Sequence, residues 1–473
     1  MTRQIVIDPI TRVEGHGKVT LYLDDSGEVR DARLHVTQFR GFEKFCEGRP
    51  FSEMPSLTAR ICGICPVSHS LASAKACDAL LAVQVPRTAQ NLRKILNLAQ
   101  LLQSHALSFF HLSSPDLLLG MESDPAERNV FGVIRSHPSL ARNGIRLRQI
   151  GQQMIETLGA KRIHSPWVIP GGVAGPLASE DREALLVLIP EALSIIQETI
   201  EWFRSVLNQY TEEIRTFANF PTLFLALVAG DGHLDHYDGR MRVIDSEGNR
   251  LLDQADPAQY ADYIEEWVEP DSYLKSPCYK PMGYPDGIYR VGSLARLNAV
   301  DRCGTPRADE AWKELPQPNQ GPLLSSFHYH YARLVESLYA VERIEEILHD
   351  PDILDDRVCA RAQPNNLEGV GAIEAPRGTL IHHYRIDKNG LMVWANLIVA
   401  TGHNNLAMNR GILQVAKEYV KGDRISEGIL NRIEAVIRSF DPCLSCSTHA
   451  LARMSLQIQL LAPTGECLDM VAR

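Results

Sequence analysis

Two Cys-x-x-Cys pairs lie near opposite ends of the chain, and they constrain its fold more than any other feature. Cys62 and Cys65 form the first pair, and Cys443 and Cys446 form the second. The turn within such a pair brings both sulfurs to one side, so each pair can offer two thiolates to one metal ion. Zinc ribbons separate their two pairs by roughly 15–20 residues. Here positions 65 and 443 are 378 residues apart, so a four-thiolate site can form only if nearly the whole chain folds around it.

A histidine follows each pair, and the two segments resemble the paired signatures of a known enzyme family. The first reads Arg60-Ile-Cys-Gly-Ile-Cys-Pro-Val-Ser-His69, and the second reads Asp441-Pro-Cys-Leu-Ser-Cys-Ser-Thr-His449. Both resemble the signatures of nickel-iron hydrogenase large subunits, most closely those of the soluble NAD-reducing type. Further segments resemble segments of that family and occur in the family's order: Thr11–His16, Phe39–Glu43, Pro170–Gly172, Glu374–Gly378 and Leu397–Thr401.

The resemblance implies a nickel-iron centre that the four cysteines hold. The first cysteine of each pair, Cys62 and Cys443, would be a terminal nickel ligand. The second of each pair, Cys65 and Cys446, would bridge nickel to iron, and the iron would also carry one carbon monoxide and two cyanides. The residue types alone leave the metal open, because thiolates bind nickel, iron, copper(I) or zinc.

Two other functions fit parts of this pattern. The four sulfurs could hold a structural zinc ion, which metal analysis would distinguish from nickel. The corresponding subunit of respiratory complex I shares the hydrogenase fold but serves quinone reduction. That subunit lacks the four cysteines, and all four are present here, so the hydrogenase interpretation is favoured.

The reaction that the resemblance implies is the reversible heterolytic cleavage of dihydrogen into protons and electrons. Cys443 would be the first base for the proton, and Glu14 would relay it outward. Arg377 would lie over the open metal position with Asp441 as its partner. Thr401 would donate a hydrogen bond to a cyanide. Without the resemblance, Glu14 would be interpreted as a solvated loop carboxylate and Arg377 as part of a surface salt bridge.

Three more residues are implied around this centre. Val399 and Ala400 would form an apolar wall beside the metals. His69 would form a hydrogen bond with a bridging sulfur, in the way that outer partners commonly orient metal ligands. The residue type alone also allows His69 to be a zinc ligand.

A magnesium site is implied as well, formed by Glu43, His449 and the backbone carbonyl of Leu397. Carboxylate and carbonyl oxygens suit this cation, whereas a histidine is a less usual ligand for it. No iron–sulfur cluster or NAD site is expected in this chain, because it has no Gly-x-Gly-x-x-Gly motif and its other cysteines lack Cys-x-x-Cys spacing. Those cysteines are Cys46, Cys77, Cys278, Cys303, Cys359 and Cys467.

Electrons would therefore leave through other subunits. The resemblance implies a small subunit with iron–sulfur clusters, together with flavin- and iron–sulfur-containing diaphorase subunits that serve NAD; F420, NADP or another acceptor is the alternative. It also implies a maturation protease and nickel-insertion proteins. A net charge of −10 disfavours nucleic-acid partners. Without an apolar run of roughly 18 residues, a signal peptide or regular cysteine spacing, the chain is expected to be cytoplasmic and to have no membrane span.

The hydrophobic periodicity predicts an α+β fold that is mainly helical, with a bundle of long helices as its core and small peripheral β hairpins. Pro190 is expected to kink or interrupt one helix, and Ser179 is expected to cap its start. The predicted helices cover residues 86–112, 142–158, 179–217 and 326–349. The predicted strands lie within residues 4–36, 223–228, 241–252 and 379–399.

Residues 255–320 are rich in Pro, Tyr, Gly and Asp, which predicts an irregular surface excursion. The chain is expected to divide into two parts. Residues 1–449 would be a single intertwined catalytic unit, because the metal site needs both ends. Residues 450–473 would be a C-terminal extension that is removed on maturation, since chains of the resembled family end at the histidine that corresponds to His449.

Overall fold

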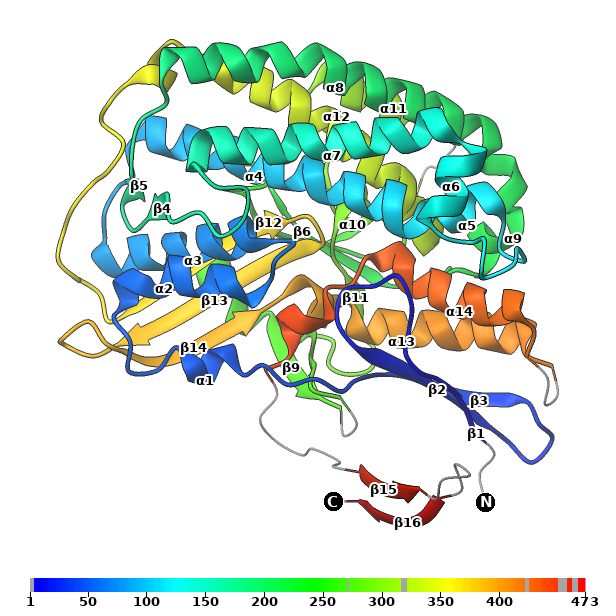
Figure 1. The fold of residues 1–473 in the computed structure, drawn as a ribbon. Coiled ribbons are helices and arrows are strands. Elements are labelled where there is room, and N and C mark those ends of the chain that lie inside the picture. The colour runs from blue at the N-terminus through cyan, green and yellow to red at the C-terminus, as the bar shows by residue number, and fades with distance from the viewer. Residues whose placement is uncertain are drawn as a thin grey trace.

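The computed structural model describes residues 4–269, 272–315, 321–421, 425–449, 457–461 and 467–472, the last two ranges by their backbone alone. Long helices fill the upper half of Figure 1, and small sheets lie below them. This arrangement confirms the predicted α+β, mainly helical fold. The long helices are α3 (Pro66–Leu81), α4 (Arg87–Leu107), α7 (Pro138–Gly159), α8 (Ser179–Val206) and α12 (Tyr329–Leu348).

Helix α4 lies at the centre of the bundle and packs against α3, α7 and α12. Its leucines, isoleucine and alanines are buried along its whole length, because it has helical neighbours on several sides. Helix α7 approaches it closely at Gly151, where an added Cβ would lie only 2.8 Å from the Cβ of Gln103. A larger residue at position 151 would therefore push the two helices apart.

Helix α8 does not break at Pro190, so of the two expected effects, a kink or an interruption, the interruption is wrong. It runs through that residue as one helix from Ser179 to Val206. Pro190 is exposed, so the carbonyl that loses its intrahelical partner can be hydrated instead. The helix stops before the predicted end and is followed by a 3-10 turn and α9 (Thr211–Thr216). Ser179 is the first helical residue, and Ala178 precedes it without a side-chain cap.

Other helices begin or end about one turn away from their predicted boundaries. The helix predicted over residues 86–112 ends as α4 at Leu107 and continues as a π-helical turn over Ser108–Ser113 and α5 (Ser114–Leu119). The helix predicted from residue 142 begins earlier, because Pro138 opens α7 at its first position. A 3-10 turn over Ser326–His328 precedes α12.

The predicted strands form three small sheets. Strands β1 (Gln4–Ile7), β2 (Gly17–Leu23) and β3 (Val29–Val36) form an antiparallel meander. A mixed sheet has the order β11-β6-β7-β8, in which β11 (Tyr289–Arg290) runs parallel to β6. Its other strands are β6 (Leu223–Val228), β7 (Arg240–Ile244) and β8 (Arg250–Ala255).

The third sheet contains a strand that the sequence pattern did not predict. Strand β12 (Glu368–Ala375) pairs with β13 (Gly378–Ile386), which pairs with β14 (Met392–Ile398). Strand β12 contains Gly369 and Gly371. These two glycines hide the strand pattern in the sequence, because glycine is depleted in strands. Here they let α3 lie directly on the sheet: a Cβ at Gly371 would be 2.1 Å from the Ala72 carbonyl oxygen.

The prediction of an irregular excursion over residues 255–320 is wrong where the described part of that segment forms regular elements, and residues 270–271 and 316–320 lie outside the described residues. The described part forms β9 (Ile264–Val268), β10 (Lys275–Tyr279), β11, α10 (Ser293–Ala299) and α11 (Pro306–Lys313). Six of the seven residues of α10 are buried. A short helix that is covered on all sides has no polar face, so its sequence shows no amphipathic period.

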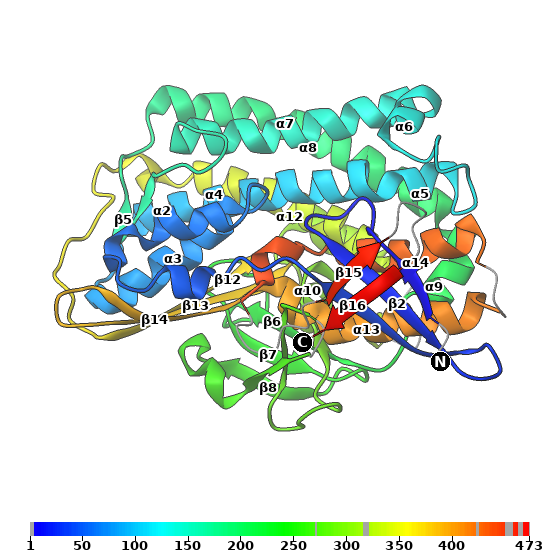
Figure 2. The ribbon, with the colours of Figure 1, turned by 60° about the horizontal axis from the view of Figure 1, so that its bottom comes forward.

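Segments near the two ends of the chain, around residues 14 and 441–449, lie side by side. Helices α13 (Ala400–Tyr419) and α14 (Glu427–Phe440) lead into the segment Asp441–His449. Residue 14 forms an isolated parallel bridge with residue 443, and residue 274 forms an antiparallel bridge with residue 448. This segment is therefore enclosed by parts of the chain that are far away in sequence (Figure 2).

The tail beyond residue 449 contains one described element. Strands β15 (Gln457–Leu461) and β16 (Cys467–Ala472) pair as an antiparallel hairpin. The rest of residues 450–473 lies outside the described residues. Across the described ranges, every helix is too short or too polar to serve as a membrane span.

Candidate metal centre

The four cysteines of the two pairs form one buried cluster. Their sulfur atoms all lie within 4.8 Å of one another. The Sγ–Sγ distances are 3.4 Å for Cys62 and Cys443, 3.6 Å for Cys65 and Cys446, and 2.7 Å for Cys443 and Cys446. All four residues are at most 6% exposed. The fold thus assembles the four-sulfur site that the duplicated signature predicts.

Local backbone structure presents each sulfur inward. Cys62 follows a 3-10 turn in an extended conformation, and its sulfur accepts the backbone N–H groups of Ile64 and Cys65 at 3.2 and 3.4 Å. Cys65 is the N-cap of α3. On the other side, the backbone N–H of Cys443 donates to Thr401 Oγ1 at 2.8 Å. These backbone contacts fix the turns that carry Cys62 and Cys443.

Electrostatics favour a cation at the cluster. Burial raises the pKa of the Cys443 thiol and that of the Cys446 thiol well above the usual value for a cysteine. The pKa of Cys65 is lowered well below its usual value because neighbouring thiols, that of Cys443 first, donate hydrogen bonds to its sulfur. Four thiolates cannot share this buried space without a positive charge among them, so a soft metal ion would replace the protons.

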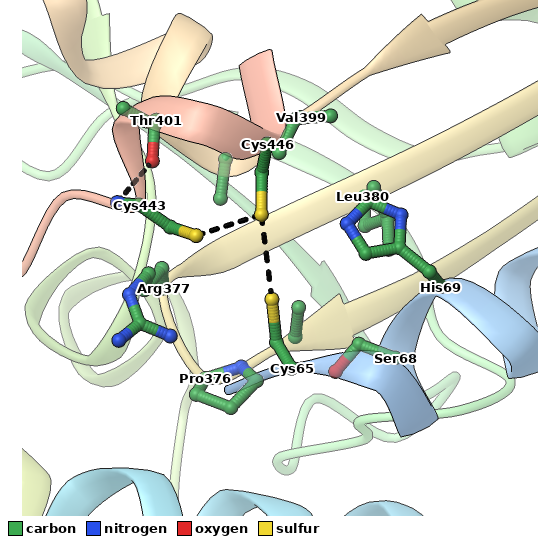
Figure 3. A pocket seen from close by; sticks show the side chains of 12 residues that line it. Cys65, Ser68, His69, Pro376, Arg377, Leu380, Val399, Thr401, Cys443 and Cys446 are labelled. Carbon is green, nitrogen blue, oxygen red and sulfur yellow. Dashed lines mark hydrogen bonds between the residues drawn. The ribbon is translucent and has the colours of Figure 1, made fainter. Parts of the chain in front are cut away.

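A pocket opens beside the sulfurs (Figure 3). It is bounded by residues from α3, the β12–β13 turn and the start of α13. Apolar side chains form most of its wall, and a few polar groups interrupt it. The lining residues are Cys65, Ser68, His69, Ala375, Pro376, Arg377, Leu380, Val399, Ala400, Thr401, Cys443 and Cys446.

Arg377 is fixed at one side of this pocket by Asp441. Its Nε donates to the Asp441 backbone oxygen at 2.7 Å, and its Nη2 lies 3.2 Å from the carboxylate. A weaker bond of 3.3 Å joins Nη1 to Ser104 Oγ. Although burial lowers the pKa of Arg377, Asp441 and the cysteine thiolates raise it overall. The guanidinium is therefore charged at all physiological pH values.

The turn that carries Arg377 is held by a buried ion cluster. Arg296 on α10 donates to both carboxylate oxygens of Glu336, at 2.5 and 2.7 Å, and to Glu374 at 2.7 Å. It also donates to the carbonyls of Ala375 and Pro376 at 3.0 and 3.3 Å. These bonds fix the backbone next to Arg377. Arg296 was not predicted as part of the site, because nothing in a sequence distinguishes a buried arginine from a solvated one.

Glu14 contacts the cluster from the N-terminal side. Its Oε2 accepts from the Cys443 thiol at 3.0 Å and from the Ser445 backbone N–H at 3.1 Å. Its Oε1 accepts from Ser445 Oγ at 2.5 Å. Glu14 is half-buried, so its carboxylate connects an enclosed sulfur with the outside of this chain.

His69 lies behind Cys65 in a buried polar chain. Its Nδ1 is 3.1 Å from His382 Nε2, and His382 Nδ1 is 2.6 Å from the Tyr384 hydroxyl. Tyr384 donates in turn to Ser73 Oγ at 2.9 Å. These contacts fix the ring of His69 and occupy its Nδ1, which leaves Nε2 for the cysteine side. A hydrogen bond from His69 is among the causes that lower the pKa of Cys65.

Of the residues expected to bind magnesium, Glu43 contacts Leu397, and Lys275 lies beside both Glu43 and His449. Glu43 Oε1 accepts from Lys275 Nζ and from the backbone N–H of Leu397, both at 2.8 Å. Lys275 Nζ also bonds Asn396 Oδ1 at 2.8 Å. Both ring nitrogens of His449 are buried without a hydrogen-bond partner among the described residues. A buried imidazole with two free nitrogens fits a metal-ligand role.

Comparison with known proteins identifies the family. Residues 40–128 and 236–449 match the family described as nickel-dependent hydrogenase, and residues 4–39 match one described as HoxL-like. The chain belongs to the nickel-dependent hydrogenase family. The nickel dependence of this family agrees with the cluster of four cysteines that the fold brings together.

Individual relatives support the same family assignment. The NAD-reducing hydrogenase HoxS subunit beta of Cupriavidus necator is 41% identical over the whole of both chains. A vhu subunit of the F420-non-reducing hydrogenase of Methanocaldococcus jannaschii is 43% identical over 88% of this chain and 100% of its own. A crystal structure of an NAD+-reducing [NiFe]-hydrogenase in the H2-reduced state matches with a TM-score of 0.92 and 48% identity, over 95% of this chain and 100% of that one.

Proposed function

We propose that this chain is the catalytic subunit of a nickel-iron hydrogenase that reversibly cleaves dihydrogen into protons and electrons. The observation that carries the proposal is the cluster of four buried sulfurs with a carboxylate hydrogen-bonded to one of them and an arginine held over the adjoining pocket. Cys62 and Cys443 would bind nickel terminally, and Cys65 and Cys446 would bridge it to an iron that carries one carbon monoxide and two cyanides. This centre supplies the polarisation and the electron storage that heterolytic cleavage needs.

The residues around the centre handle the proton. The Cys443 sulfur would accept it, because a metal-bound thiolate is deprotonated near neutral pH yet still weakly basic. Glu14 Oε2, 3.0 Å from that sulfur, would take the proton next and pass it outward. Ser445 donates two hydrogen bonds to Glu14 and so keeps the carboxylate turned toward the sulfur.

Other residues shape the pocket. Arg377, held by Asp441, would place a fixed positive charge and N–H donors at the open side. Thr401 Oγ1 accepts the Cys443 N–H, so its own proton is free to be donated to a cyanide. Val399 and Ala400 line the pocket with apolar groups, which limits the access of water.

Two further roles belong to the proposal. His69 would form a hydrogen bond with the sulfur of a bridging cysteine through the nitrogen that His382 leaves free; because its Nδ1–H is directed to His382, this bond requires a second proton on the ring. Glu43, His449 and the carbonyl of Leu397 would hold magnesium. The ammonium group of Lys275, which bonds Glu43, would then compete with the cation for that carboxylate.

The electron acceptor is reached through other subunits. We propose a small subunit with iron–sulfur clusters, and flavin-containing diaphorase subunits with NAD as the acceptor, in a cytoplasmic complex. The full-length similarity to the NAD-reducing HoxS subunit beta supports this assignment. The similarity to F420-non-reducing hydrogenase subunits is of the same order, so NADP or another acceptor is the second candidate.

Infrared absorption of the purified complex tests the proposal. One carbonyl band and two cyanide bands are expected, together with nickel and iron by metal analysis and hydrogen uptake with an artificial acceptor. Zinc as the only metal, with no such bands, would instead identify a structural zinc protein.

Intact-mass measurement tests the proposed maturation. Residues 450–473 are expected to be absent from active, nickel-loaded protein, because Cys443 and Cys446 precede them so closely that a tail could keep the second pair open until the metals are inserted. Maturation protease and nickel-insertion proteins would act before the cleavage. A mass that includes Arg473 in fully active enzyme would overturn this prediction.

A further inference from the structure

One polar group in the pocket has no role in the proposed function. Ser68 is fully buried, and among the described residues its hydroxyl has no hydrogen-bond partner. A buried hydroxyl without a partner destabilises the folded state, and native proteins leave few such groups. In Figure 3 the hydroxyl of Ser68 points from α3 toward the side of the pocket that Cys65 and Pro376 line.

One of the two helix carbonyls that could accept from this hydroxyl is already fully used. A serine in a helix usually donates to the carbonyl three or four residues earlier. For Ser68 the carbonyl four residues earlier is that of Ile64, which already accepts from the side-chain amides of Gln100 and Gln103 at 2.8 and 2.9 Å. Both lone pairs of this oxygen are thereby used. The carbonyl three residues earlier, that of Cys65, accepts the His69 N–H.

Two residues further along the same helix, Ser70 shows the ordinary arrangement. Its hydroxyl donates to the Val67 carbonyl at 2.8 Å. Ser68 and Ser70 are both buried, so burial does not explain the difference between them. The difference is that the hydroxyl of Ser68 lines the pocket beside the sulfurs, whereas that of Ser70 bonds its own helix.

The groups around the pocket favour one kind of hydrogen-bond acceptor for the Ser68 hydroxyl. Leu380, Ala375 and Val399 line it with apolar groups, and the charged guanidinium of Arg377 forms another part of the same wall. The first turn of α3 also points its positive end at this region, because the N-terminal N–H groups of a helix have no partner within it. A small anionic acceptor is therefore favoured over a neutral one.

We propose that Ser68 donates a hydrogen bond to a cyanide ligand of the iron. The inference rests on the proposed function, since the cyanides belong to the centre proposed there. The nitrogen of a metal-bound cyanide carries negative charge and a lone pair, whereas the oxygen of carbon monoxide is a poor acceptor, so the cyanide is the partner. Thr401 would serve one cyanide from the α13 side, and Ser68 would serve the other from α3, together with Arg377 across the pocket.

Infrared spectroscopy of the assembled complex carrying Ser68→Ala tests this role. One cyanide band is expected to shift beyond its wild-type width, while the other cyanide band and the carbonyl band shift less. Nickel and iron contents are expected to stay at the wild-type level, because Ser68 is not a metal ligand. Ser68→Thr keeps the hydroxyl and is expected to restore the band position. Ser70→Ala is the matched control and is expected to leave all three bands unchanged.

The outcomes separate this inference from the function on which it rests. Unchanged cyanide bands in a metal-loaded Ser68→Ala complex would refute the role of Ser68 and leave the proposed function intact. Wild-type protein without carbonyl and cyanide bands would refute the proposed function itself. If Ser68→Ala fails to load its metals, Ser68→Cys is measured instead. Its thiol is a weak donor of similar size, and an unshifted cyanide band in that variant would overturn the inference.

Discussion

Cys443→Ser is expected to abolish both nickel binding and hydrogen turnover. The Cys443 sulfur lies 2.7 Å from Cys446 and 3.4 Å from Cys62, so it is a central member of the cluster. A serine hydroxyl stays protonated at neutral pH and is a harder ligand than a thiolate, which nickel prefers here. Removing a residue that only hydrogen-bonds a metal ligand typically lowers metal affinity roughly 10- to 100-fold. Removing a ligand itself is expected to lower it further. Metal analysis and hydrogen uptake are the measurements.

Cys77→Ala provides the control for this variant. Cys77 is also fully buried, but its thiol donates to the Phe51 carbonyl at 3.3 Å and lies outside the cluster. Burial raises the pKa of its thiol, as it does at Cys443 and Cys446, but Cys77 has no second cysteine at Cys-x-x-Cys spacing, as is usual for a small core residue. This variant is expected to keep its nickel. Full nickel occupancy and turnover in Cys443→Ser would contradict the assigned ligand set.

Glu14→Gln is expected to stop hydrogen turnover while the metals remain bound. Glutamine matches glutamate in shape and can still accept from Ser445, but it cannot take a proton from Cys443. Positioned acids and bases contribute roughly 100- to 10,000-fold to rates, so turnover is expected to fall within that range. Nickel content and the carbonyl and cyanide bands are expected to stay at their wild-type values, because Glu14 contacts the sulfur and not the metal.

Two further observations make this test specific. Para/ortho hydrogen conversion is expected to persist in Glu14→Gln, because the step at the metals and Cys443 precedes the transfer to Glu14. Glu28→Gln, at an exposed position in the same N-terminal sheet region, is expected to leave turnover unchanged. Loss of nickel from Glu14→Gln would show that the residue is structural and that the proton leaves by another route.

Local sequence patterns were enough to predict much of the fold. The long helices carry apolar residues at spacings of three and four, and the N-terminal meander alternates in the manner of a half-buried sheet, so both could be predicted. The errors fall where tertiary surroundings override local signals. Pro190 is tolerated inside α8 because it faces solvent, and β12 contains glycines because α3 rests directly on it.

Residue types and their intervals were enough to define the chemistry of the centre. Two Cys-x-x-Cys pairs, each with a following histidine, define four soft ligands and the family to which they belong. Their spacing of 378 residues also required that the ends of the chain meet. These conclusions hold whatever the details of the fold, because residue types and intervals do not change on folding.

The partners that surround the ligands, in contrast, could be known only from the folded chain. Arg296, Lys275 and Ser68 resemble any other arginine, lysine or serine in the sequence, yet each is placed beside the centre by contacts between distant segments. The physical reason is that a hydrogen bond depends on a distance of about 3 Å and a direction. Neither can be read from residues that lie hundreds of positions apart. The buried ion cluster under Arg377 and the unpartnered hydroxyl of Ser68 therefore became visible only after folding had brought those segments together.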